Sequence, residues 1–110
     1  MIKRTSIVWK RPELSDAEFR RIWLGEHVEY AKQLPGVREY VIDFIPNAPP
    51  GMPSAVAVLR FDSRDALDAA FNNPQLKQGL METRDQFAQS VQVSIVDECV
   101  VVPRHRGISQ

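Results

Sequence analysis

The sequence predicts an α+β fold, in which strand-like and helix-like segments follow one another in the order βαββαβ. Two observations lead to this order. Residues 14–36 carry the start and stop signals of an amphipathic helix, and four other runs show the apolar patterns of β-strands. At 110 residues the chain has room for one hydrophobic core, so we expect a single domain over residues 1–103 and a polar tail over 104–110.

The first helix is defined by its two ends. Ser15 suits the N-cap position, and Glu18, three residues later, completes a capping box. Pro35 interrupts the hydrogen-bond ladder and Gly36 tolerates the turn that follows, so we expect a helix over residues 16–34. At about 100° per residue, one apolar stripe of this helix contains Phe19, Ile22, Trp23, His27, Tyr30, Ala31 and Leu34.

The remaining elements follow from alternation, apolar runs and turn residues. Asn73 and Pro74 end one helix and begin another, because asparagine is a good N-cap and proline suits the first helical position. A proline-rich loop, residues 47–53, is a candidate rim or lid. The expected strands are 2–9, 37–45, 55–61 and 91–103, and the expected later helices are 64–71 and one that starts at Asn73-Pro74.

This order of elements is that of the ferredoxin-like fold, a four-stranded antiparallel sheet with its helices on one face. The second, third and fourth expected strands carry apolar side chains on both faces. The helices therefore leave an apolar sheet surface uncovered, which a monomer would rarely expose to water. We expect a twofold homodimer in which two sheets bury these surfaces against each other.

Charge and composition exclude several classes of partner. The 14 basic and 14 acidic residues cancel, so the charge balance favours neither nucleic acid nor an anionic membrane. No apolar run reaches the ~18 residues that span a bilayer, and the N-terminus lacks a signal-peptide core, so we expect a cytoplasmic protein. Cys99, the single cysteine, lies in an apolar run and is expected to be a small core residue.

His27 is the one titratable group near the centre of the apolar helix stripe, and this position has two interpretations. In the first it is a core histidine, satisfied by a backbone carbonyl or a neighbouring side chain. In the second it is a general base in a hydrophobic pocket, where desolvation lowers the pKa of the imidazole and keeps it neutral near pH 7. Trp23 and Tyr30, each one turn away, are then either pocket walls or plain core packing.

The same segment carries a family likeness. The chain resembles the EthD-like family of dimeric α/β barrels through residues placed between its first two strands: Glu18-Phe19, Trp23, His27, Leu34-Pro35-Gly36 and Tyr40. The resemblance implies a homodimer whose sheets form a barrel, with a mostly apolar ligand pocket between the sheet and the helices of each subunit. Relatives in the wider superfamily include lactone isomerases, cofactor-independent anthrone oxygenases, polyketide cyclases and haem peroxidases. The helix histidine of the family matches His27.

The leading expectation is a small cofactor-independent enzyme of catabolic or secondary metabolism that acts on an apolar, ring-containing molecule. On the resemblance, it is an oxidoreductase or monooxygenase with His27 as the proton-transfer residue. The candidate substrate-binding residues are Trp9, Trp23, Tyr30 and Tyr40. Two alternatives stay open: an isomerase or cyclase of the same superfamily, and a non-catalytic ligand-binding accessory protein of a degradation pathway. We expect no metal or organic cofactor, because the sequence has two histidines, no C-x-x-C motif and no glycine-rich phosphate loop.

Overall fold

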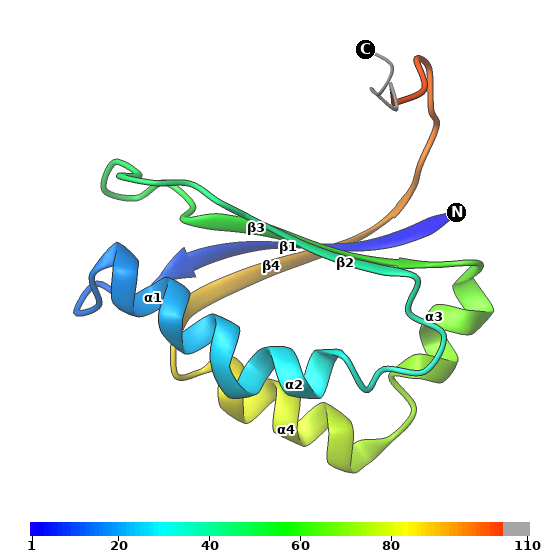
Figure 1. Cartoon of the computed structure of the whole chain (residues 1–110), viewed down its shortest axis with the longest axis horizontal. Coiled ribbons are helices and arrows are strands. Elements are labelled where there is room, and N and C mark those ends of the chain that lie inside the picture. The colour runs from blue at the N-terminus through cyan, green and yellow to red at the C-terminus, as the bar shows by residue number, and fades with distance from the viewer. Residues whose placement is uncertain (105–110) are drawn as a thin grey trace, which may run out of the picture.

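The computed structural model describes residues 1–104, so the expected polar tail lies outside the described residues except for Arg104. Figure 1 shows a layer of strands above a layer of helices. One element, η1, is a π-helical turn. In chain order the elements are β1 (Ile2–Lys10), α1 (Asp16–Ile22), η1 (Trp23–His27), α2 (Val28–Ala31), β2 (Glu39–Phe44), β3 (Ala55–Phe61), α3 (Arg64–Ala70), α4 (Pro74–Arg84) and β4 (Ala88–Asp97).

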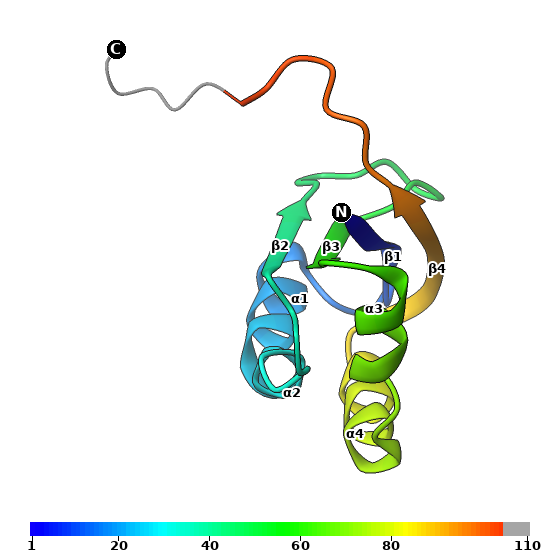
Figure 2. The same cartoon turned by 90° about the vertical axis from the view of Figure 1, so that its right-hand side faces the viewer.

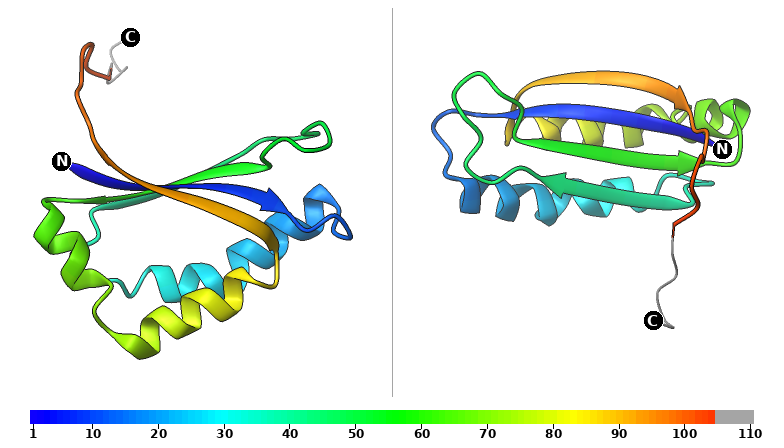
Figure 3. Two further views of the ribbon diagram at one scale, coloured as in Figure 1. Left: turned by 180° about the vertical axis from the view of Figure 1, so that it is seen from behind. Right: turned by 90° about the horizontal axis from the view of Figure 1, so that it is seen from above.

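The four strands form one antiparallel sheet in the order β2-β3-β1-β4. Figure 2 shows the helices gathered on one side of this sheet, and the view from above in Figure 3 shows the strands lying over them. The predicted ferredoxin-like fold, with a four-stranded antiparallel sheet and its helices on one face, is confirmed.

The first helix begins as predicted but is not continuous. The Ser15 hydroxyl accepts a hydrogen bond from the backbone N–H of Glu18 at 3.1 Å, and the Glu18 carboxylate accepts one from the backbone N–H of Ser15 at 2.9 Å. After Ile22 the chain widens into the π-helical turn η1, in which Gly25 leaves helical geometry with φ −86° and ψ −119°. The helix ends at Ala31 rather than at Leu34. The sequence pattern was interpreted with the 3.6-residue period of a regular α-helix, which does not reveal a π-helical turn. Such turns are frequent at functional sites.

The last strand differs from its prediction at both ends. β4 spans Ala88–Asp97 rather than 91–103. Its register with β1 explains the end, because Asp97 pairs with Ile2, the first residue of β1. Cys99 follows the strand and is exposed, so the expectation that it is a core residue is wrong.

The core between the helices and the sheet has two clusters. The first contains Val8, Phe19, Trp23, Ala55, Ala57, Phe87 and Ala88. The second contains Leu34, Leu59, Phe61, Leu67, Ala70 and Leu76. Tyr30 packs between the helices against Gly79 of α4, where an added Cβ would lie only 2.5 Å from the tyrosine ring. The predicted burial of Phe19, Trp23, Ala31 and Leu34 is confirmed.

The other face of the sheet carries no helix within residues 1–104 (Figure 1). On β3 the side chains of Ala55, Ala57, Leu59 and Phe61 are buried toward the helices, while the alternate residues point the other way. The strand registers place Val41 and Thr5 beside Val58 on this second face, and Ile7 beside Val56. We call this surface the open face.

Candidate active site

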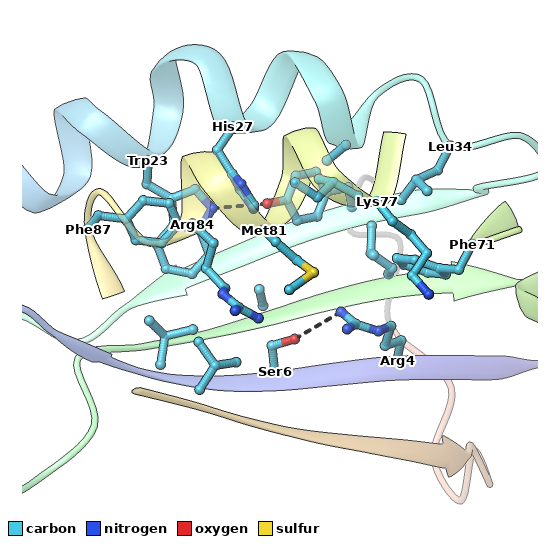
Figure 4. A pocket seen from close by; sticks show the side chains of 17 residues that line it. Arg4, Ser6, Trp23, His27, Leu34, Phe71, Lys77, Met81, Arg84 and Phe87 are labelled. Carbon is cyan, nitrogen blue, oxygen red and sulfur yellow. Dashed lines mark hydrogen bonds between the residues drawn. The ribbon is translucent and has the colours of Figure 1, made fainter. Parts of the chain in front are cut away.

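A cavity of about 210 Å³ lies between the sheet and the helices, where the two core clusters meet. Residues of η1, α2 and α4 line it from the helix layer, and residues of all four strands line it from the sheet (Figure 4). Most of the lining is apolar and includes Trp23, Leu34, Ala57, Leu59 and Phe87. A lining of this kind, with few polar groups, is typical of small-molecule sites.

Three of the five site residues expected from the sequence meet at this cavity. His27 and Trp23 reach it from η1, and Tyr40 reaches it from β2. Tyr30 is not among the lining residues, since it packs between α2 and α4. Trp9 does not line the cavity either. Its indole N–H donates to the carbonyl of Gly51 at 3.2 Å, in the proline-rich loop.

A hydrogen bond to Thr83 of α4 sets the orientation of the His27 ring. The Nδ1 atom of His27 lies 2.7 Å from Oγ1 of Thr83. That hydroxyl has two carbonyl acceptors, Gly79 at 2.7 Å and Leu80 at 3.2 Å. Because one hydroxyl proton cannot serve both a carbonyl and the imidazole, we assign the ring proton to Nδ1 and the acceptor role to Thr83.

The other ring nitrogen of His27 is left for the cavity. Within residues 1–104, every fully buried polar side-chain atom has a hydrogen-bond partner, and the hydrogen bond of the imidazole is made by Nδ1. Nε2 therefore reaches accessible space, and with the proton on Nδ1 it presents its lone pair there. A neutral imidazole in this state can accept a proton from a bound molecule.

The surroundings of His27 keep it neutral. Burial, followed by the positive charge of Arg84, lowers the pKa of His27 from its ordinary 6.5 to about 4, and Arg4 contributes in the same direction. The Leu80 carbonyl opposes this shift but does not cancel it. At neutral pH the base form of His27 is thus fully populated.

Tyr40 supplies a hydrogen-bond donor to the same cavity. The indole N–H of Trp23 donates to the Tyr40 hydroxyl at 3.0 Å, so the hydroxyl keeps its own proton for another acceptor. Burial raises the pKa of Tyr40, which keeps the phenol protonated. Trp23 stacks on Phe87 with ring centroids 4.6 Å apart, which fixes the indole that holds Tyr40.

Three positively charged residues also line the cavity, and the sequence analysis did not identify them: Arg4, Lys77 and Arg84. The sequence does contain a pattern that places these residues on inward faces. Arg4 alternates with Ser6 and Val8 on the inward face of β1, and the interval of seven residues between Lys77 and Arg84 corresponds to two turns of α4. Thr83 was missed as well, because one threonine in a helix carries no pattern of its own.

Among residues 1–104, no three side chains of His, Cys, Asp or Glu are grouped so that they could hold a metal ion. The helices of this part of the chain lack the length and apolarity needed to cross a membrane. The expectations about cofactors and localisation stay predictions.

Comparison with known proteins identifies one family. The model of the EthD domain matches residues 11–90, the segment that runs from the end of β1 into β4 and includes His27 and Thr83. Curated proteins gave no match to this sequence.

Three solved structures illustrate the likeness of the fold. An ethyl tert-butyl ether d (EthD) family protein from Bacillus halodurans C-125 has 19% sequence identity and a TM-score of 0.70, with 90% of this chain and 100% of that chain covered. SnoaB, a cofactor-independent oxygenase from Streptomyces nogalater, has 14% identity and a TM-score of 0.65, with 94% and 97% covered. A dimeric ferredoxin-like protein of unknown function from Thermobifida fusca YX has 10% identity and a TM-score of 0.65, with 86% and 88% covered.

The low pKa of His27 predicts a specific loss of stability in acid. The folded state binds this proton less readily than the unfolded state, so the contribution is complete above about pH 6.5 and is lost as the pH falls toward 4. The full loss amounts to about 3 kcal/mol of unfolding free energy. Urea unfolding at a series of pH values should show it in the native protein and much less of it in His27→Gln, which has no imidazole to protonate. Parallel pH profiles of the two proteins would contradict the assignment.

Proposed function

The chain belongs to the EthD domain family, and on this premise we propose that it is a small cofactor-independent enzyme that moves a proton on an apolar, ring-containing molecule. One observation carries the proposal: the neutral His27 lines an apolar cavity, with Nδ1 held by Thr83 and Nε2 left for a bound molecule. A ring fits the size of the site, since a cavity of about 150 Å³ holds a benzene molecule.

The geometry supports a sequence of two roles. Nε2 of His27 accepts a proton from an activated C–H or O–H group of the substrate. The Tyr40 hydroxyl donates a hydrogen bond to the substrate oxygen on which negative charge develops, and Trp23 holds that hydroxyl in place. The product of this step is an enolate or phenolate.

The fate of that anion separates the leading reaction from the second. In an oxidoreductase, the carbanion form gives electrons to dioxygen, a C–O bond forms, and loss of water from the hydroperoxide leaves a new carbonyl group. The likeness in fold to SnoaB, a cofactor-independent oxygenase, supports this choice. In an isomerase or cyclase, a proton returns to a different carbon. A ligand-binding accessory protein would have the same cavity without turnover.

The base role of His27 is tested without knowledge of the natural substrate. In deuterium oxide, the protein should exchange the α-hydrogens of a cyclic ketone such as 2-indanone, which NMR follows, while an oxygen electrode records any uptake of dioxygen. We expect His27→Gln to lower the exchange rate by roughly 10² to 10⁴ and Tyr40→Phe to lower it by a smaller factor.

Tyr30→Phe is the matched control, because Tyr30 lies outside the cavity, and it should exchange at the native rate. Thermal melts show whether each variant is folded. Native exchange rates in folded His27→Gln would rule out the base, and a lack of exchange with bound ketone would favour the accessory protein.

The assembly that we propose is a homodimer formed through the open face. Half-buried apolar side chains of β1 and β3 occupy its centre, and Val41 of β2 is 39% exposed. At one end, Arg60 pairs with Glu39 and Glu98, which leaves the apolar centre as the part to be covered. Val100, Val101 and Val102 follow β4 as exposed apolar side chains. The Thermobifida fusca protein of similar fold is dimeric, which supports a dimer but does not identify its interface.

Sedimentation velocity tests the dimer. At micromolar concentration the chain should sediment as a dimer, because an interface over this face would bury more than about 1,000 Å². Val41→Asp should weaken the dimer, since it places a charge on the open face.

Val93→Asp is its matched control: Val93 is 41% exposed, also lies on an edge strand, and pairs with Ser6 on the helix side of the sheet. A native chain that sediments as a monomer would refute the proposed assembly.

A further inference from the structure

We infer that the ligand of this cavity is an acid: a one- or two-ring molecule whose carboxylate binds between Arg4, Arg84 and Lys77. The inference rests on the proposed function and names the substrate class of the same site. Arg4, Arg84 and Lys77 line the cavity, whereas none of its lining residues in the described chain is Asp or Glu. Figure 4 shows the charged ends of these three side chains spread along the cavity, with Arg84 on the side of His27, Lys77 near Phe71, and Arg4 between them above β1.

Arg4 is the most informative of the three cations. It points inward from β1, is partly buried, and its guanidinium lies 4.7 Å from the centre of the Phe71 ring. Its one polar side-chain contact within residues 1–104 is a hydrogen bond of 3.5 Å to the Ser6 hydroxyl. A partly buried guanidinium without a carboxylate is unfavourable, because the lost hydration is not replaced by an ion pair.

Within residues 1–104, arginines other than Arg4 either form an ion pair with a carboxylate or, like Arg20 and Arg21, are exposed to solvent. Arg38 binds Asp62, Arg60 binds Glu39 and Glu98, and Arg64 binds Asp68. These ion pairs lie on the surface or on the open face. The contrast indicates that Arg4 is left for a group that the chain does not contain.

Arg84 and Lys77 extend the positive charge along α4. Arg84 has one ion pair, to the exposed Asp85 at 3.5 Å, which lies toward solvent and neutralises it weakly. Lys77 is exposed at the rim and makes no ion pair within residues 1–104. Burial and the nearby Arg84 lower the pKa of Arg4, as expected for two like charges that face one space.

The rest of the cavity selects the body of the ligand. Trp23, Leu34, Leu59 and Phe87 offer apolar contact, and the volume of about 210 Å³ suits one ring or a small fused pair with a substituent. Two guanidinium groups match the planar oxygen pair of a carboxylate. A highly charged phosphate ester would place its charge well in this site but its polar body poorly.

A bound carboxylate would also act on His27. Arg84 and Arg4 both lower the pKa of this histidine while the cavity holds no anion. An anion between them offsets their charge, so the imidazole becomes more basic when a ligand of the right kind is bound. Binding of an acid should therefore be coupled to proton uptake as the pH falls, and binding of a neutral analogue should not.

The test compares acids with their neutral amides on the full chain by titration calorimetry. The pairs are benzoate with benzamide, cinnamate with cinnamamide, and 2-naphthoate with 2-naphthamide. At least one acid should bind more than about tenfold more tightly than its amide. Arg4→Met and Arg84→Met should each remove most of this preference and leave amide binding unchanged, because methionine keeps the apolar part of the side chain.

Arg21→Met is the matched control, since Arg21 is exposed on α1 away from the cavity. Amides that bind as tightly as their acids, or a failure of every acid to bind, would overturn the inference. If Arg4→Met does not fold, the inference is tested by the ratio of acid affinity to amide affinity in the native chain and in Arg84→Met.

Repeating the titrations in buffers of different ionisation enthalpy measures proton uptake, which should accompany acid binding at about pH 6 and vanish in His27→Gln. A preference for acids that persists while His27→Gln retains native exchange rates would refute the proposed reaction but not the ligand class.

Discussion

The hydrogen bond between His27 and Thr83 is the interaction on which the site depends. It joins η1 to α4, two segments of the helix layer that lie more than fifty residues apart in the chain. It determines which imidazole nitrogen faces the cavity, because the Thr83 hydroxyl already has carbonyl acceptors in its own helix. The π-helical turn and the close approach of Tyr30 to Gly79 belong to the same contact between helices.

Two opposing electrostatic effects meet at this site. Burial and the arginines keep His27 neutral, which makes its base form available at neutral pH, but they also make it a weak base. The same arginines lie beside a cavity without acidic lining residues in the described chain. A ligand with a negative charge would pair with the arginines and would also raise the pKa of His27. The substrate itself would then complete the active site, and an empty cavity would not hold a strong base.

The sequence predicted those features that local rules determine. Ser15 and Glu18 predict a helix start through the hydrogen bonds of their own side chains. The bounds of the expected strand 55–61 are those of β3. Trp23 was placed on the correct face because the helical period holds up to the π-helical turn, and His27, at the end of that turn, lines the same cavity. The predictions that were wrong concern features that depend on pairing with a distant segment of the chain. β4 ends where its pairing with β1 ends, and Cys99, which lies beyond that end, is exposed.

The polar half of the site was missed for a related reason. Arg4 and Arg84 are ordinary surface residues by composition, and only the packing of α4 over β1 brings them to one cavity. Tyr30 and Trp9 were selected as aromatic residues near the right segment, but Tyr30 lies between helices and Trp9 contacts the proline-rich loop. A single sequence does not distinguish an aromatic residue that packs from one that lines a cavity.

The proposed site requires a His27 ring that is neutral, protonated on Nδ1, and open to the cavity through Nε2. Nitrogen-15 NMR of the imidazole rings, titrated against pH, measures the protonation state of each ring nitrogen. The variant His105→Gln removes the signals of the second histidine and so assigns those of His27. We expect a His27 ring with its proton on Nδ1 and an unprotonated Nε2 at neutral pH, and a titration midpoint near 4. A ring that carries its proton on Nε2, or a midpoint at or above the ordinary 6.5, would contradict this expectation.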